Sequence, residues 1–183
     1  MKSIYLALVH HPVKDRAGAA ITTAITNLDV HDIARTARTY GLAGYFLVTP
    51  LDAQVQLTDA ILAHWRTGAG VKRIPERAEA LRLVRTCPSI EAARDEVARE
   101  AGEAPLLVTT SARALEASEL TAYAALRPFD RPILLLFGTG HGLTDDTVRA
   151  ADHRLPPIRP EGYNHLSVRA AVAITLDRLL GDG

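Results

Sequence analysis

The 183-residue sequence is 48% hydrophobic and 23% charged, with a formal net charge of zero at pH 7, as in an ordinary globular protein. This length accommodates one sizeable α/β domain and is too short for two, so we expect a single domain over residues 1–183. One cysteine, Cys87, excludes an internal disulfide, and its apolar surroundings predict a buried structural thiol. No signal-peptide pattern or membrane-spanning apolar run is present, so we expect a cytoplasmic enzyme or binding protein.

Charge is unevenly distributed along the chain. Residues 66–85 carry six basic side chains against two acidic ones, whereas residues 88–120 carry seven acidic side chains against three arginines. A solvated helix face explains this pattern. The alternative is a surface that contacts phosphate groups, to which Lys72 and Arg73 would belong.

Short apolar runs alternate with segments of helical periodicity. Strands are predicted at residues 4–9, 44–49, 83–87, 105–110 and 133–137, and helices at 28–40, 51–66, 76–81, 90–101, 120–126, 146–151 and 164–180. Such alternation favours an α/β fold with a parallel sheet and helices on both faces. Residues 14–20 and the proline-rich residues 156–162 are predicted to be loops.

The two histidines that end the first strand, His10 and His11, have no Asp, Glu or Cys close enough in sequence to complete a metal site. We therefore expect no metal.

One helix carries a polar face. Asn27, His31, Arg35 and Arg38 follow one another at steps of four, four and three residues, which places them on the same side of the helix predicted at 28–40. A ligand-binding face is one interpretation. The other is a solvated face on which Asn27 caps the helix.

The run Gly138, Thr139, Gly140, His141 and Gly142 follows the buried strand at 133–137. Ligands bind at the carboxyl ends of parallel strands, and glycine lets a ligand approach the main chain, so this loop is a candidate binding site. A P-loop would have lysine after the last glycine, and a dinucleotide fingerprint would have glycine three residues after its second. Both requirements fall on the same position, which is Leu143. A simple chain reversal remains the alternative.

The last predicted helix is apolar along much of its surface. Val168, Val172, Leu176 and Leu179 form a stripe, and several alanines occupy its other sides. This composition predicts a helix buried nearly all round.

Three segments now stand in the order of the three motifs of the SPOUT class of RNA methyltransferases, the α/β-knot enzymes. Residues 32–41 (DIARTARTYG) resemble the first motif, whose arginine falls on Arg35. Residues 135–143 (LLFGTGHGL) resemble the second. Residues 155–158 (LPPI) with 164–174 (NHLSVRAAVAI) resemble the third. The whole chain is similar to a compact bacterial subfamily, and residues 26–32 (TNLDVHD) are its most characteristic run.

This resemblance implies a deep trefoil knot in the C-terminal third and a homodimer in which the knot helices pack together. It also implies S-adenosylmethionine as cofactor, S-adenosylhomocysteine as product, and structured RNA (tRNA or rRNA) as substrate. The chain departs from many relatives at His141, where they have Glu or Asn, and at His165 and Arg169, where they have small or apolar residues. The target base therefore cannot be inherited from better-known members.

The resemblance assigns the arginine of the first motif to Arg35. We expect Arg35, with Asn27 and His31 from the same helix face, to be catalytic, and Arg38 to bind RNA together with Lys72 and Arg73 of the basic segment. Arg35 would steer the carboxylate of the cofactor or a phosphate of the acceptor. The expected cofactor-binding residues are Thr109, Thr110, Gly138, Thr139, Gly140, His141, Gly142, Leu155, Pro157, Ile158, Asn164, Leu166 and Ser167.

The predicted function is methyl transfer from S-adenosylmethionine to a nucleotide in structured RNA, without a metal. Such a step needs a precisely positioned acceptor and a group that takes or steers a proton. The alternative is a non-catalytic RNA-binding or assembly protein that retains the cofactor pocket. A small-nucleotide hydrolase is disfavoured, because the sequence has no evident metal cluster or nucleophile–base pair.

Overall fold

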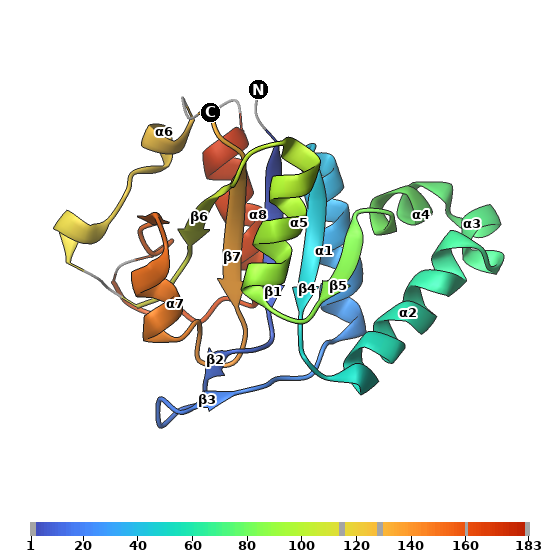
Figure 1. The fold of residues 1–183 in the computed structure, drawn as a ribbon, viewed down its shortest axis with the longest axis horizontal. Helices are drawn as coiled ribbons and strands as arrows, with labels where there is room; N and C mark the ends of the chain where they lie inside the picture. The colour runs from blue at the N-terminus through green and yellow to red at the C-terminus, as the bar shows by residue number, and fades with distance from the viewer. Residues whose placement is uncertain (1–2, 114–115, 128–129, 160, 182–183) are drawn as a thin grey trace.

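A computed structural model describes residues 3–113, 116–127, 130–159 and 161–181 (Figure 1). Its centre is a six-stranded sheet of order β5-β4-β1-β7-β6-β8, in which every neighbouring pair is parallel. The strands are β1 (Ile4–Val9), β4 (Gly44–Val48), β5 (Val84–Cys87), β6 (Leu106–Thr109), β7 (Ile133–Gly138) and β8 (His153–Arg154). The predicted parallel sheet is confirmed.

Helices cover both faces of this sheet. They are α1 (Asn27–Thr39), α2 (Asp52–Arg66), α3 (Ala69–Arg73), α4 (Pro75–Leu81), α5 (Ile90–Ala101), α6 (Tyr123–Leu126), α7 (Asp145–Ala150) and α8 (Val168–Leu180), with a 3₁₀ turn at Ala117–Glu119. Figure 1 shows α5 in front of the sheet and α1 and α8 behind it. No described helix has the length and apolar character needed to cross a membrane.

The strands at the centre of the sheet are buried on both sides. In β1, Leu6 and Leu8 belong to the core under α1 and α8, whereas Tyr5, Ala7 and Val9 belong to the core under α5. Successive side chains of a strand point to opposite faces. This double burial explains why β1 and β7 are continuous apolar runs without polar alternation.

The start of α1 is fixed by its own first turn. Thr26 is the N-cap: its hydroxyl accepts from the backbone N–H of Asp29 at 3.1 Å and donates to the Asp29 carboxylate at 2.7 Å. The expected cap, Asn27, is instead the first helical residue. The helix ends before Gly41, whose φ of 69° favours glycine and confirms the predicted stop.

Three short elements differ from expectation. Residues 14–20 are not wholly a loop, because β2 (Val13–Lys14) and β3 (Ala20–Ile21) form an antiparallel hairpin. The strand β8 pairs with β6 where no strand was predicted. The helix α3, which contains Gly70, forms between the helices predicted at 51–66 and 76–81, where none was predicted. Each element has five residues or fewer, too short for a period to be recognised.

The helix α8 begins at Val168, with Ser167 as N-cap, and not at residue 164. Its stripe residues Val172, Leu176 and Leu179 are buried as predicted. Residues 169–171 and 173–174 are only half-buried in this single chain, because one side of α8 packs on the sheet and α1 while another faces outward. The trefoil knot of the C-terminal third stays a prediction.

Candidate functional site at the glycine loop

The glycine loop follows β7 at the carboxyl end of the sheet. A Cβ on Gly138 would lie 2.5 Å from the backbone nitrogen of Leu143, because the loop folds back on itself at this point. Gly140 and Gly142 have φ of 58° and 96°, a region that side chains rarely adopt. Glycine is therefore required by close backbone approach at one position and by conformation at two others.

The β2–β3 hairpin holds this loop from below. The backbone N–H of Lys14 donates to the carbonyl of Gly142 at 2.8 Å, and that of His141 donates to the carbonyl of Lys14 at 2.9 Å. The Lys14 side chain is buried and forms an ion pair with Asp145 at the start of α7. The hydrogen bond from Lys14 lowers the pKa of the Asp145 carboxyl. The loop is thus bound to the hairpin through both main chain and charge.

A buried polar relay supports the loop from the end of β1. Thr139 Oγ1 donates to the carbonyl of Val9 at 3.0 Å, so it must accept from Thr23 Oγ1, which lies 2.6 Å away. Thr23 in turn accepts from His10 Nδ1 at 3.0 Å, which assigns the ring proton to that nitrogen. His10 is fully buried, and this burial lowers its pKa to about 4.

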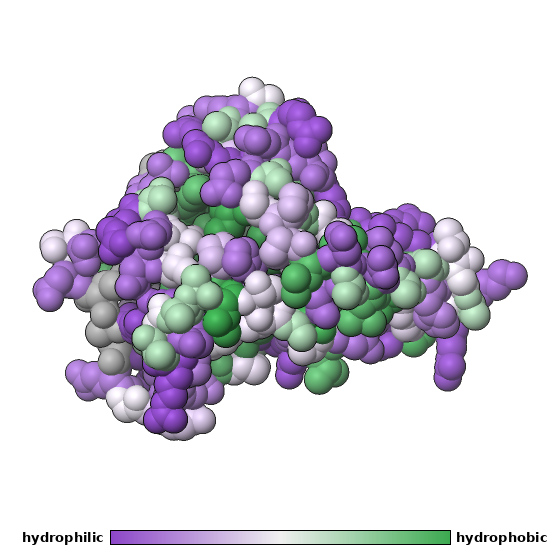
Figure 2. All heavy atoms as spheres, turned by 60° about the horizontal axis from the view of Figure 1, so that its bottom comes forward, coloured by the Kyte–Doolittle hydropathy of each residue, from purple (hydrophilic) through white to green (hydrophobic). Residues whose placement is uncertain are grey.

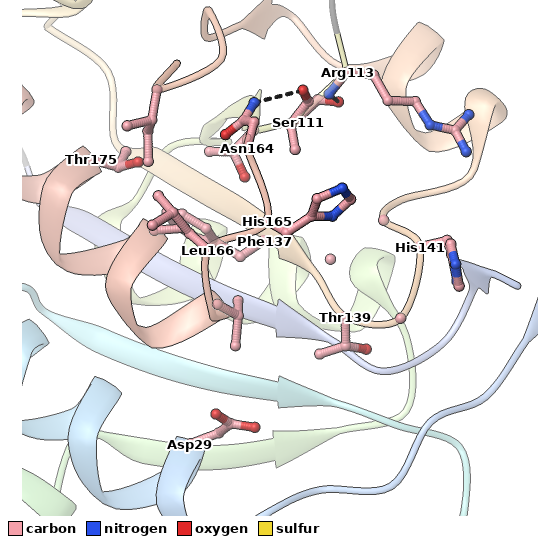
Figure 3. Close-up of a pocket in the computed structure, with 18 of the residues that line it drawn as sticks. Asp29, Ser111, Arg113, Phe137, Thr139, His141, Asn164, His165, Leu166 and Thr175 are labelled. Carbon is pink, nitrogen blue, oxygen red and sulfur yellow. Dashed lines mark hydrogen bonds between the residues drawn. The ribbon is translucent and has the colours of Figure 1, made fainter. Parts of the chain in front are cut away.

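A cavity of about 600 Å³ opens beside the loop, between the ends of β6 and β7 and the N-terminal half of α8 (Figure 3). Nine of the predicted cofactor-binding residues line it: Thr110, Gly138, Thr139, Gly140, His141, Gly142, Ile158, Asn164 and Leu166. Segments far apart in sequence meet here, and Asn164 Nδ2 donates to the carbonyl of Ala112 at 2.9 Å.

Four predicted residues stand behind this lining. Thr109, Leu155 and Pro157 are buried, and Leu155 donates its N–H to the carbonyl of Thr109 at 2.9 Å. Ser167 caps α8 by accepting from the N–H of Ala170. Their side chains hold the walls of the cavity in place.

Other lining residues were not predicted. They are Thr23, Ala24, Thr26, Asp29, Ser111, Ala112, Arg113, Tyr123, Phe137, His165, Val168, Ala171 and Thr175. Pro156 also lines the cavity and lies within residues 155–158, whose main chain is expected to bind the cofactor. The spacing of Val168, Ala171 and Thr175 is that of one helix face and could have placed them together. Asp29 had no such signal, because its partner Arg169 is 140 residues away in sequence.

Asp29 forms part of a charged cluster between α1 and α8. Arg169 Nη1 lies 3.0 Å from Asp29 Oδ1, and Arg169 Nε lies 3.4 Å from Asp32 Oδ2. The Asp29 residue is 6% exposed, so its charge needs this partner. Arg169 therefore connects the wall of the cavity to the next turn of α1.

The predicted catalytic residues lie elsewhere in the chain. Asn27, His31 and Arg35 line a second hollow, also of about 600 Å³, between α1 and α2. Arg38 lies outside both hollows and forms an exposed ion pair with Glu79. Within one chain, the structure does not bring Arg35 to the cavity at the glycine loop.

Lys72 and Arg73, the other predicted RNA-binding residues, are exposed on α3, outside both hollows. Cys87 is a buried free thiol as predicted, and burial raises its pKa to about 12. Among the residues that the structure describes, no group of three or more His, Cys, Asp or Glu side chains could hold a metal.

This chain resembles one relative that is more than twice its length and another of similar length. A protein named tRNA (guanine-N(1)-)-methyltransferase from Nitratidesulfovibrio vulgaris is 46% identical over 99% of this chain, which spans 43% of that protein. An uncharacterized protein from Aquifex aeolicus is 40% identical, over 97% of this chain and 88% of its own length. Since the chain spans less than half of the first relative, the guanine specificity in that name is not assigned to it.

Solved structures share the fold at low sequence identity. A probable methylase family protein from Haemophilus influenzae superposes with a TM-score of 0.61 at 20% identity, over 97% of this chain and 65% of that one. The SpoU methyltransferase AviRb from Streptomyces viridochromogenes, in complex with S-adenosylmethionine, superposes with a TM-score of 0.59 at 16% identity, over 98% and 57%.

Sequence, fold and the position of the glycine loop agree with one family. Residues 3–181, nearly the whole chain, match the family described as SAM-dependent RNA methyltransferase. The chain belongs to this family of S-adenosylmethionine-dependent RNA methyltransferases.

Proposed function

We propose that this protein transfers a methyl group from S-adenosylmethionine, bound in the cavity at the glycine loop, to a nucleotide in structured RNA (tRNA or rRNA). The observation that carries this proposal is the cavity itself, where nine predicted cofactor-binding residues from four separate segments meet. Residues 1–183 would act as one domain around one sheet. The reaction is placed in the cytoplasm, because structured RNA of these classes is found there.

The residues of the cavity fit the cofactor. Gly138, Gly140 and Gly142 line the cavity without a side chain, and Phe137 and Leu166 supply apolar surface of the kind that an adenine ring needs. Polar side chains at the rim, among them Asn164 and Thr110, could accept or donate hydrogen bonds to a ribose. When bound, the cofactor supplies an electrophilic methyl group on a sulfonium.

The protein would promote transfer by positioning the acceptor and steering its charge. Arg35, Asn27 and His31 are proposed for this task, with Arg35 pairing with a phosphate of the acceptor. Arg35 lines the α1–α2 hollow of its own chain and not the cofactor cavity. Arg35 could therefore act at a cofactor cavity only if that cavity belonged to a second copy of the chain.

A homodimer through the knot helices, of which α8 is one, would provide that second copy. Its support is the half-buried side of α8, where Ala170 and Ala173 would permit close packing between helices. Lys72 and Arg73 are proposed to contact RNA at a distance from the reaction, which their exposure on α3 allows.

The decisive experiment uses total RNA from a strain that lacks the gene. This RNA is incubated with the protein and labelled S-adenosylmethionine, then digested to nucleosides. We expect one labelled nucleoside, which is present in wild-type RNA and missing from the deletion strain. RNA and cofactor binding without any label above background would replace the enzyme with the non-catalytic alternative.

A further inference from the structure

The hollow between α1 and α2 has the chemistry of a nucleotide-binding site, separate from the cofactor cavity. Its wall combines the cationic side chains Arg35 and Arg77, the imidazoles of His31 and His64, and the indole of Trp65. The apolar side chains Leu28 and Ile61 complete it, and Leu28 is 60% exposed. Figure 2 views the end of the molecule toward which the strands point, where hydrophobic atoms reach the surface between hydrophilic ones.

Aromatic and cationic groups are packed together in this wall. The Arg77 guanidinium lies 4.9 Å from the centroid of the Trp65 ring. The rings of His31 and His64 each meet Trp65 edge-on, with centroids 5.3 Å away. Trp65 therefore holds the Arg77 guanidinium in place. Stacked Arg and aromatic planes are the surface on which proteins bind unpaired bases.

The positive charge of the hollow is not neutralised by its neighbours. The acidic side chain in the wall, Asp32, contacts Arg169. Among the described residues, none forms an ion pair with Arg35, whereas Arg38, one turn later on the same helix, pairs with Glu79. The wall thus carries two guanidinium groups whose charge calls for an anion.

Two buried nitrogen atoms in this wall also lack a partner. His31 Nδ1 and Arg77 Nε make no hydrogen bond within the part of the chain that the structure describes. Burial, together with the positive charges of Arg77 and Arg35, lowers the pKa of the His31 imidazole. Buried donors and acceptors are normally satisfied, and the exceptions in native structures often lie at functional sites or beside ordered water.

We propose that the α1–α2 hollow binds one nucleotide of single-stranded RNA, with its phosphate on Arg35 and Arg77 and its base against the Arg77–Trp65 stack and Leu28. The proposal rests on the proposed function, because it treats this nucleotide as a neighbour of the one to be methylated. Beyond the proposed function, it assigns the hollow as a second RNA-binding site, a holding site for the strand next to the methylated nucleotide.

The position of the hollow supports this assignment. The first turn of α1 separates the two sites: Thr26 and Asp29 line the cofactor cavity, whereas Asn27 and Leu28 line the hollow. An α-helix with its side chains is about 10 Å across. The two sites of one chain thus lie on opposite sides of this helix. In the proposed homodimer, one RNA strand would occupy the hollow of one copy and present a neighbouring nucleotide to the cofactor cavity of the second copy.

Trp65 is the only tryptophan in the sequence, so its fluorescence reports on this hollow alone. We would titrate the full chain with a short single-stranded oligoribonucleotide. Quenching of Trp65 is expected, and the affinity should fall as salt rises. Arg35→Gln should weaken this binding about tenfold, a loss of the size expected for one charged contact. Arg94→Gln, an exposed arginine on α5 across the sheet, should leave it unchanged.

Three results would overturn the proposal or separate it from the proposed function. Methylation of RNA without any quenching of Trp65 would refute the holding site and leave the enzyme assignment intact. Dissociation of the Arg35→Gln dimer into monomers, seen as a lower mass in solution, with unchanged oligoribonucleotide affinity, would show that the hollow is an interface between copies. This result would refute RNA binding there. Quenching that persists although calorimetry detects no S-adenosylmethionine binding would support the hollow and refute the methyltransferase.

Discussion

The two hollows on either side of the first turn of α1 have similar volumes and are built from different parts of the chain. The cavity at the glycine loop, where we propose that the cofactor binds, is shaped by main chain: glycines, a proline loop and the ends of parallel strands. The α1–α2 hollow is shaped by long side chains, chiefly Arg35, Arg77 and Trp65. A backbone-built site suits a single invariant cofactor, whereas a side-chain-built site can change specificity by substitution without altering the fold.

The largest expected effect tests the backbone-built site. In Gly138→Ala, the added methyl group would lie 2.5 Å from the backbone nitrogen of Leu143, so the glycine loop must move. We expect the affinity for S-adenosylmethionine to fall at least about a hundredfold, equivalent to about 3 kcal/mol. Isothermal titration calorimetry measures this loss, with circular dichroism as the check on folding.

The control for this variant is Gly102→Ala at the C-terminus of α5. Gly102 also has positive φ, at 74°, but nothing lies within 4 Å of the added methyl group. It should lose about 1–2 kcal/mol of stability from backbone strain and keep full cofactor affinity. Equal cofactor affinity in both variants would show that the loop is a chain reversal and not part of a binding site.

The second prediction concerns the pH dependence of the relay below the cavity. His10 has a folded-state pKa of about 4, against about 6.5 when unfolded, because burial disfavours the charged ring. Between these values the unfolded chain binds more protons than the folded one, so stability falls as pH drops from 6.5 to 4. The loss should reach about 3 kcal/mol at pH 4.

Urea unfolding at a series of pH values measures this loss. His10→Gln removes the titrating ring, so its stability should vary less with pH across this window than that of the wild type. His141→Gln replaces an exposed imidazole on the glycine loop and should keep the wild-type dependence. The same pH dependence in His10→Gln as in the wild type would contradict the buried neutral ring.

The third prediction tests the wall between the two hollows. Arg169→Gln leaves the buried carboxylate of Asp29 without its partner at 3.0 Å. We expect a loss of about 1–3 kcal/mol in the free energy of unfolding, because an unpaired buried charge is unfavourable. Arg149→Gln, which breaks the exposed pair with Asp146, should change stability by no more than about 0.5 kcal/mol. Similar losses in both would mean that Asp29 is solvated.

The contrast between the hollows also explains what could be predicted from sequence. The strands β1, β4 and β7 and the glycine loop depend on local composition, and they lie where apolar runs and glycines indicated. The hairpin β2–β3 escaped prediction because its position depends on long-range contacts, such as the bridge between Val13 and Leu143. No local period encodes a contact of this kind.

A site built from side chains was harder to predict than one built from backbone, because it also depends on contacts between segments that are distant in sequence. The spacing of Asn27, His31 and Arg35 placed them on one helix face, and they do line one hollow. The opposite wall comes from Arg77 on α4, which packs against α1, and from Trp65 on α2, which packs against α4. This packing leaves no signature in any one segment alone. Sequence therefore indicated which side of α1 is polar without indicating what it faces.

The smallest expected effect separates two arginines on α1. Arg38 was predicted to bind RNA, yet its guanidinium forms an exposed ion pair with Glu79. Such pairs contribute little, so Arg38→Gln should change the free energy of unfolding by less than about 0.5 kcal/mol. Its RNA methylation rate should stay close to that of the wild type.

Arg35→Gln removes the unpaired guanidinium of the hollow, and its methylation rate should fall strongly while its stability is retained. The comparison uses labelled S-adenosylmethionine with the same RNA for both variants. A larger loss of activity in Arg38→Gln than in Arg35→Gln would move the RNA-binding surface from the α1–α2 hollow to the outer edge of α1 and α4.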